Sequence, residues 1–152
     1  MARYLNSDAI PLYNPIEEYL NSTGHWDGKD RIRALADLVP CNNPYWRELF
    51  YRWFLSMTAH WQNIDRQHGN NTSPLLVGAQ GYRKSTFCRI LLPPELRFGY
   101  TDSIDFKSKQ DAERSLGRFF LINIDEFDQI SVNQQGFLKH LLQKPVANLR
   151  KP

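Results

Sequence analysis

Residues 73–86 read SPLLVGAQGYRKST, and this stretch decides the fold. Its first part, residues 73–77, is a short apolar run that predicts a buried strand. The run leads directly into a loop that contains two glycines, and a helix is expected to begin near Lys84. A strand, a glycine-containing loop and a helix in this order predict an α/β unit built on a parallel sheet.

The loop matches the Walker A pattern G-x-x-x-x-G-K-[ST] at every position but one. In this motif, backbone amides surround the phosphate oxygens of a nucleotide. Lys84 is expected to contact the β- and γ-phosphates, and Ser85 to offer its hydroxyl to Mg²⁺. The predicted nucleotide-binding residues are Gly78, Ala79, Gln80, Gly81, Tyr82, Arg83, Lys84, Ser85 and Thr86.

Arg83 is the one departure, because it stands where the pattern has its last glycine. Glycine serves at such a position when the backbone needs a positive φ or must approach phosphate closely. A residue with a Cβ costs of order 1 kcal/mol in the left-handed region. We therefore expect Arg83 to weaken binding or alter the loop, while its positive charge acts in the opposite direction.

A second apolar run, FFLINI at residues 119–124, ends in Asp125 and Glu126. This is the Walker B arrangement, in which a buried strand delivers an aspartate beside the Mg²⁺ held by the first loop. Asp125 is thus the predicted metal ligand together with Ser85. Glu126 is the predicted base that polarises the attacking water, and Lys84 and Glu126 are the predicted catalytic residues.

The segment between the two motifs fits a parallel sheet. Residues 101–106 are polar and turn-like, and residues 107–116 predict a crossover helix that Gly117 ends. A parallel strand pair needs such a crossover. After the acidic pair, residues 131–143 predict a helix whose inward side chains are Phe137, Leu138, Leu141 and Leu142.

Residues 1–72 have a different, helical texture. Asn14 and Pro15 form a cap-then-proline signal for a first helix, and residues 30–38 predict a second. A third helix is expected from Asn43 to a stop at Gly69, with one apolar stripe. The stripe consists of Trp46, Leu49, Phe50, Trp53, Phe54, Met57, His60, Trp61 and Ile64. Such a stripe is more often core than a base-stacking surface.

These patterns predict an α/β protein with a helical N-terminal region (1–72) and a partial parallel-sheet P-loop NTPase core (73–152). The chain has 152 residues, a formal net charge of +3 and two cysteines outside any CxxC pair. A charge this small is weak support for nucleic-acid binding. No apolar run approaches the ~20 residues of a membrane span, and the start lacks a signal peptide, so we expect a cytoplasmic protein without membrane partners.

The chain resembles the virulence-associated protein E family of P-loop ATPases. Three blocks carry this resemblance: NPIEEYL (14–20) with HWDGKDRI (25–32); LLVGAQG (75–81) with KST (84–86); and DSI (102–104) through KSK (107–109), then IDE (124–126). The family has glycine before the lysine, where this chain has Arg83.

The resemblance implies a fold related to AAA+ and superfamily 3 helicases, with ATP and Mg²⁺ as cofactors. It also implies replication of phages, plasmids or genomic islands, homo-oligomeric rings on single-stranded DNA, and a primase partner. Such ATPases need a later strand with a polar sensor and an arginine finger. The sequence stops at Pro152 without either, so we expect a fragment of a longer polypeptide.

Two other functions remain open on the sequence. The chain could be a non-catalytic DNA- or partner-binding module with a degenerate P-loop, an alternative motivated by Arg83. It could also be a small-molecule kinase, although the segment from Leu92 to Glu95 does not resemble the arginine-bearing lid that a kinase needs.

Overall fold

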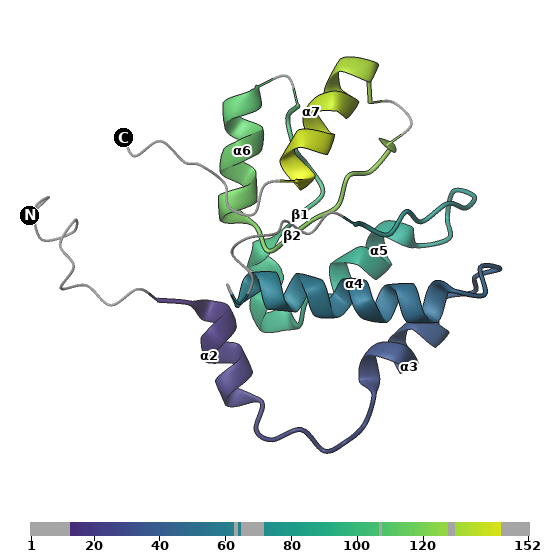
Figure 1. Cartoon of the computed structure of the whole chain (residues 1–152), viewed down its shortest axis with the longest axis vertical. Coiled ribbons are helices and arrows are strands. Elements are labelled where there is room, and N and C mark those ends of the chain that lie inside the picture. Colours follow the sequence, from purple (N-terminus) through teal and green to yellow (C-terminus); the bar gives the residue numbers. More distant parts are fainter. Residues whose placement is uncertain (1–12, 63, 65–71, 107, 128–129, 144–152) are drawn as a thin grey trace, which may run out of the picture.

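The computed structural model describes residues 13–62, 64, 72–106, 108–127 and 130–143. The predicted helix stop at Gly69 and the tail at 147–152 lie outside these ranges. The elements follow the chain in the order α2 (Pro15–Ser22), α3 (Arg31–Asp37), α4 (Trp46–Trp61), α5 (Lys84–Ile90), the 3-10 helix η1 (Pro94–Gly99), β1 (Tyr100–Thr101), α6 (Lys109–Arg118), β2 (Leu121–Ile122) and α7 (Val132–Leu142). In Figure 1, α4 crosses the middle of the molecule, with α2 and α3 on one side and α6 and α7 on the other.

The first two described helices begin at side-chain caps. Asn14 Oδ1 accepts a hydrogen bond of 3.0 Å from the backbone N–H of Ile16. Asp30 Oδ1 likewise accepts one of 2.9 Å from Arg33 N–H. Each cap satisfies an amide that has no partner within the helix. The helix starts predicted at these two sites are therefore confirmed.

The aromatic stripe of α4 forms the main core. Phe50, Trp53 and Met57 are buried there together with Ala36 of α3 and Leu91, which follows α5. This confirms the inward packing of most of the stripe, whereas Leu49 (55 % exposed) and His60 lie at the surface. The helix ends at Trp61, and Ile64 is 70 % exposed, so the predicted stripe extends further along the chain than the helix does.

Arg33 links α3 to α4 through an ion pair. Its guanidinium binds Asp30 at 2.6 Å and Glu48 of α4 at 2.8 Å, and it lies 3.5 Å from the ring centre of Tyr51. These contacts hold the pKa of the Glu48 carboxyl below its usual value, because the charged form accepts hydrogen bonds from Arg33 and Arg52.

A second, smaller cluster joins α2 to the sheet. Ile16, Leu92 and Leu96 are buried in it, with Trp61 and Phe120 packed against it. The Trp61 indole N–H donates a 2.7 Å hydrogen bond to the carbonyl of Phe120, 59 residues later. This bond ties the end of α4 to the residue that precedes β2.

The sheet consists of two parallel strands among the described residues. Tyr100 lies opposite Leu121 and Thr101 opposite Ile122. The ladder continues at both ends, where Phe120 N–H donates to Gly99 O at 2.7 Å and Asn123 N–H donates to Thr101 O at 2.8 Å. Helix α6 makes the crossover between these two strands and runs through Gly117 to Arg118. The helix was predicted here, but as the crossover from a strand at 73–77.

The buried strand predicted at residues 73–77 does not form. Residues 72–79 have no regular secondary structure, and Leu75 and Val77 are 66 % and 87 % exposed. A strand needs a neighbour for its backbone groups and cover for its apolar face. Among the described residues no strand pairs with this segment. The parallel partner of β2 is β1, whose Thr101 was expected in the turn-like segment at 101–106.

The described helices are also short. None of them combines the length and the apolar character that crossing a bilayer requires.

Candidate functional site

The two sequence motifs meet in the folded chain. Ser85 Oγ donates a 2.8 Å hydrogen bond to Asp125 Oδ2, across 40 residues of sequence. Ser85 lies in the first turn of α5, and Asp125 follows the carboxyl end of β2. The hydroxyl and the carboxylate predicted to share one metal ion are therefore in direct contact.

Lys84 folds back over the loop that precedes it. Its Nζ donates hydrogen bonds to Gly78 O at 2.8 Å and to Ala79 O at 3.0 Å. Both acceptors are neutral carbonyls. The ammonium thus holds residues 78–84 as a closed loop, and no hydrogen bond to a carboxylate competes for its charge among the described residues.

The loop turns through two left-handed residues. Gly81 has φ +87° and Arg83 has φ +56°. A positive φ is one of the two reasons for which glycine is expected at the position of Arg83, and Arg83 itself has this positive φ. This left-handed conformation is strained for an L-residue with a side chain. Arg83 directly precedes α5.

The remaining loop residues lie mainly at the surface. Gln80, Tyr82 and Thr86 are exposed. The Tyr82 ring packs so closely on Gly78 that a Cβ there would lie 3.2 Å from Tyr82 Cδ2. The small size of Gly78 therefore lets the aromatic ring cover the start of the loop.

Helix α5 is anchored through its apolar side. Phe87 packs on Phe50 of α4 with 6.1 Å between ring centres, and the following Leu91 is buried in the same core. Leu121 of β2 packs against that core too. A shared apolar contact thus fixes the positions of both Ser85 and Asp125.

Glu126 has a strained backbone. Its φ is +52°, and its N–H donates to Asp125 Oδ1 at 3.1 Å. The Asp125 carboxylate thereby uses one oxygen for Ser85 and the other for the following amide. This arrangement orients the carboxylate before any ligand is bound.

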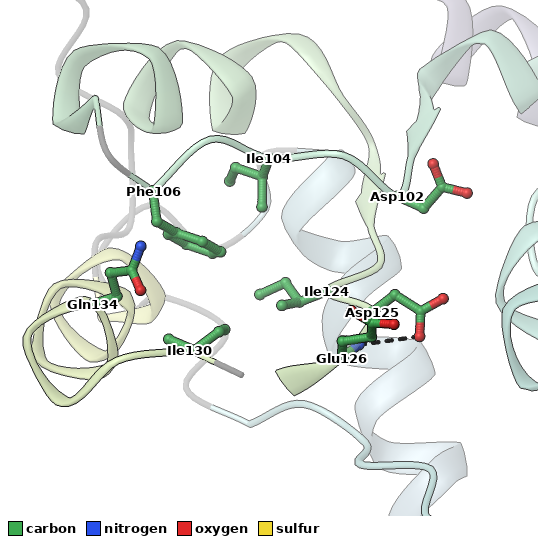
Figure 2. A pocket seen from close by; sticks show the side chains of 8 residues that line it. All are labelled: Asp102, Ile104, Phe106, Ile124, Asp125, Glu126, Ile130 and Gln134. Carbon is green, nitrogen blue, oxygen red and sulfur yellow. Dashed lines mark hydrogen bonds between the residues drawn. The ribbon is translucent and has the colours of Figure 1, made fainter. Parts of the chain in front are cut away.

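An open pocket of about 220 Å³ lies at the carboxyl ends of β1 and β2. Figure 2 shows its apolar side chains gathered on one side and Asp125 and Glu126 next to each other on another. The lining residues are Asp102, Ile104, Phe106, Ile124, Asp125, Glu126, Ile130 and Gln134.

Asp102 is a pocket residue that was not among the predicted site residues. It directly follows β1, so it lies at the same sheet edge as Asp125. The carboxyl ends of parallel strands meet at one edge, where α/β folds bind ligands. Recognising Tyr100–Thr101 as a strand would have predicted the placement of Asp102.

Cys88 lies beneath the site on α5. Burial raises the pKa of its thiol, and the nearby Asp125 carboxylate raises it further. The thiol therefore stays protonated at neutral pH and acts as a small apolar group.

The donor set suits Mg²⁺. This ion takes oxygen ligands and usually keeps several waters, with one or two protein ligands and the phosphates of its nucleotide. The contact between Ser85 Oγ and Asp125 Oδ2 places two such oxygens together. No group of three or more His, Cys, Asp or Glu residues that could hold a metal occurs in the described ranges, so the protein here offers no complete ligand cage of its own.

Fold and site together define a mixed helical domain with a small parallel sheet, in which a lysine–serine loop meets an Asp-Glu pair at a strand end. The family model of the virulence-associated protein E-like domain matches residues 20–152. The chain therefore belongs to the virulence-associated protein E-like domain family. Comparison with curated proteins and with solved structures gives no match.

Proposed function

We propose that this chain binds ATP with Mg²⁺ through residues 78–86, Asp125 and Glu126, in a P-loop NTPase core related to AAA+ and superfamily 3 helicases. Lys84 holds the β- and γ-phosphates, while Ser85 and Asp125 serve the metal. The contact between Ser85 Oγ and Asp125 Oδ2 is the observation that carries this proposal. It brings one oxygen from each of the two motifs into direct contact, as a shared metal ion requires.

Glu126 is the proposed catalytic base. It directly follows the metal ligand and lines the open pocket, where a water molecule has access to its carboxylate. A carboxylate in this position polarises the attacking water. We propose that hydrolysis takes place in a homo-oligomer.

The biological setting follows from the family. Membership of the virulence-associated protein E-like domain family supports a protein of a phage or another mobile element. We propose that ATP hydrolysis drives helicase-type movement on single-stranded DNA during replication, beside a primase. This part of the proposal rests on the family alone.

Calorimetric titration of MgATP into the chain tests the binding step. We expect saturable binding in the unmodified protein and its loss in Lys84→Ala, because the Lys84 ammonium makes charge-assisted hydrogen bonds with the phosphates. Lys29→Ala is the matched control, since Lys29 is an exposed lysine between α2 and α3. Equal binding by all three proteins would show that the loop is not the site.

A non-catalytic DNA- or partner-binding module is the second candidate. Two observations favour it: Arg83 occupies the left-handed position where glycine is expected, and residues 72–79 form no strand. This candidate predicts affinity for single-stranded DNA without any MgATP binding. The two candidates are therefore separated by the same titration, followed by a fluorescence anisotropy assay with a labelled oligonucleotide.

A further inference from the structure

Among the described residues, the non-glycine residues with positive φ both lie in the candidate site. The described backbone has positive φ at Gly24, Gly28 and Gly81, and at two residues with side chains, Arg83 and Glu126. Arg83 lies two residues before Ser85, and Glu126 directly follows Asp125. Strained backbone of this kind clusters at functional sites.

The backbone alone does not explain an arginine at this position. Glycine adopts positive φ at no steric cost, and it lets the backbone approach a phosphate more closely. If residue 83 contributed only its backbone to the loop, glycine would be the better residue. The strain at Arg83 therefore indicates a role for the guanidinium.

Arg83 is also the arginine without a partner in the described part of the chain. Its side chain is exposed. The other described arginines are engaged by carboxylates, by a carbonyl or by aromatic rings: Arg31, Arg33, Arg47, Arg52, Arg89, Arg97, Arg114 and Arg118. An unpaired guanidinium is available to bind an anion.

Its neighbour increases the local positive charge. Lys84 is bound to the carbonyls of Gly78 and Ala79, which leave its charge uncompensated. Two adjacent cations therefore lie on one loop, and no carboxylate pairs with either among the described residues. A chain of linked phosphates matches this charge, and a guanidinium binds phosphate oxygens in bidentate fashion.

We propose that the Arg83 guanidinium directly binds the phosphate chain of the nucleotide, so that the loop holds its ligand with two side-chain cations, Arg83 and Lys84. This inference rests on the proposed nucleotide binding and deepens it. Replacement of glycine by arginine exchanges a relaxed backbone for an additional phosphate contact. Arginine at position 83 therefore lowers the stability of the free loop while it raises the affinity for the ligand.

Arg83→Gly and Arg83→Gln test this inference by thermal denaturation and by MgATP titration. Arg83→Gly relieves the strain and is expected to raise the melting temperature by about 2–4 °C. The same change is expected to weaken MgATP binding roughly tenfold. Arg83→Gln keeps the strain and loses the charge, so it should weaken binding to a similar degree without raising the melting temperature. Arg52→Gln, on the exposed surface of α4, is the matched charge control.

Magnesium tripolyphosphate serves as a second probe, because it lacks base and sugar. In a direct titration, we expect both Arg83 variants to weaken binding of magnesium tripolyphosphate by the same factor as they weaken binding of MgATP. Binding by Arg83→Gly that equals or exceeds that of the unmodified chain would overturn the inference.

Lys84→Ala distinguishes a failure of the inference about Arg83 from a failure of the proposed nucleotide binding. If the unmodified chain binds MgATP, Lys84→Ala does not, and both Arg83 variants bind normally, the inference about Arg83 alone is wrong. If the unmodified chain binds no MgATP, the proposed nucleotide function fails and the role of Arg83 falls with it.

Discussion

Ser85 Oγ lies 2.8 Å from Asp125 Oδ2, and the two residues are 40 positions apart in the sequence. Ser85 is placed by α5, which packs on α4 through Phe87. Asp125 is placed by β2, whose Leu121 packs against the same core. The hydrogen bond therefore depends on the helical region as much as on the sheet.

Replacing Glu126 by Gln separates binding from hydrolysis. We expect MgATP affinity to be retained, because Glu126 is not a proposed phosphate or metal ligand. Loss of the proposed base should slow the proposed hydrolysis by roughly 10²–10⁴-fold. Phosphate release measures the rate, and Glu95→Gln on the exposed side of η1 is the control. An unchanged hydrolysis rate would remove Glu126 from the mechanism.

Gly99→Ala is expected to destabilise the sheet. A Cβ at Gly99 would lie 2.2 Å from Cδ2 of Phe120, so the Phe120 ring would have to move from its place beside Trp61. Overpacking of this kind costs about 1–3 kcal/mol in the free energy of unfolding. Urea unfolding followed by tryptophan fluorescence measures the loss.

Gly136→Ala is the matched control for that experiment. An added Cβ at Gly136 meets no atom within 4 Å, and the residue lies inside α7. Alanine is favoured over glycine in a helix by about 0.5–1 kcal/mol, so this variant should be more stable. Equal destabilisation by both variants would contradict the packing described for Phe120.

Trp61→Phe removes the hydrogen bond that ties α4 to Phe120. Phe120 O then loses its 2.7 Å donor, and we expect a loss of about 1 kcal/mol in the free energy of unfolding. Trp26→Phe provides the comparison, since Trp26 is 79 % exposed and its indole N–H bonds only the neighbouring Lys29 carbonyl. A loss in Trp26→Phe as large as that in Trp61→Phe would contradict the assigned role.

Cys88 reports on the charge of Asp125. The chain has two cysteines, so Cys41→Ser leaves Cys88 as its one thiol. Burial and the Asp125 carboxylate raise the pKa of Cys88, and we expect slow alkylation by iodoacetamide at mildly alkaline pH. Asp125→Asn removes the carboxylate charge and should accelerate the reaction. An unchanged rate would mean that the two groups do not interact.

The raised pKa of Cys88 also makes the free energy of unfolding depend on pH. The unfolded thiol ionises near its ordinary pKa of roughly 8.5, below the raised pKa of the folded protein. As the pH rises, the unfolded state therefore loses its proton first. The contribution of Cys88 to the free energy of unfolding is present below that pH and is lost as the pH rises towards the folded pKa. Cys88→Ala should flatten this part of the pH profile of stability.

Local signals in the sequence predicted the helices well. Asn14 caps α2 as expected, α3 lies within the expected residues 30–38, and the core face of α4 follows from the spacing of Phe50, Trp53 and Met57. These features depend on neighbouring residues, so the sequence pattern contains them. The contact between Ser85 and Asp125 likewise agrees with the expectation from motif order.

The pairing of the two strands, which also depends on distant partners, was not predicted. β1 is two residues long and has no alternating pattern, and its pairing with β2 depends on where α6 returns the chain. The apolar run at 73–77 predicted a strand, yet a strand forms only beside a neighbour. Asp102 was missed as a pocket residue for the same reason, because its place follows from β1.

A double-mutant cycle on Ser85 and Asp125 tests most directly whether the two motifs form one Mg²⁺–nucleotide site. ATP affinity would be measured with and without Mg²⁺ in the unmodified chain, Ser85→Ala, Asp125→Asn and the double variant. We predict that each single change weakens MgATP binding roughly tenfold, about 1.4 kcal/mol, and that the double variant loses clearly less than the sum, because both side chains serve one ion. Losses should be small without Mg²⁺. Strictly additive losses, or equal losses in the absence of Mg²⁺, would contradict a shared metal site.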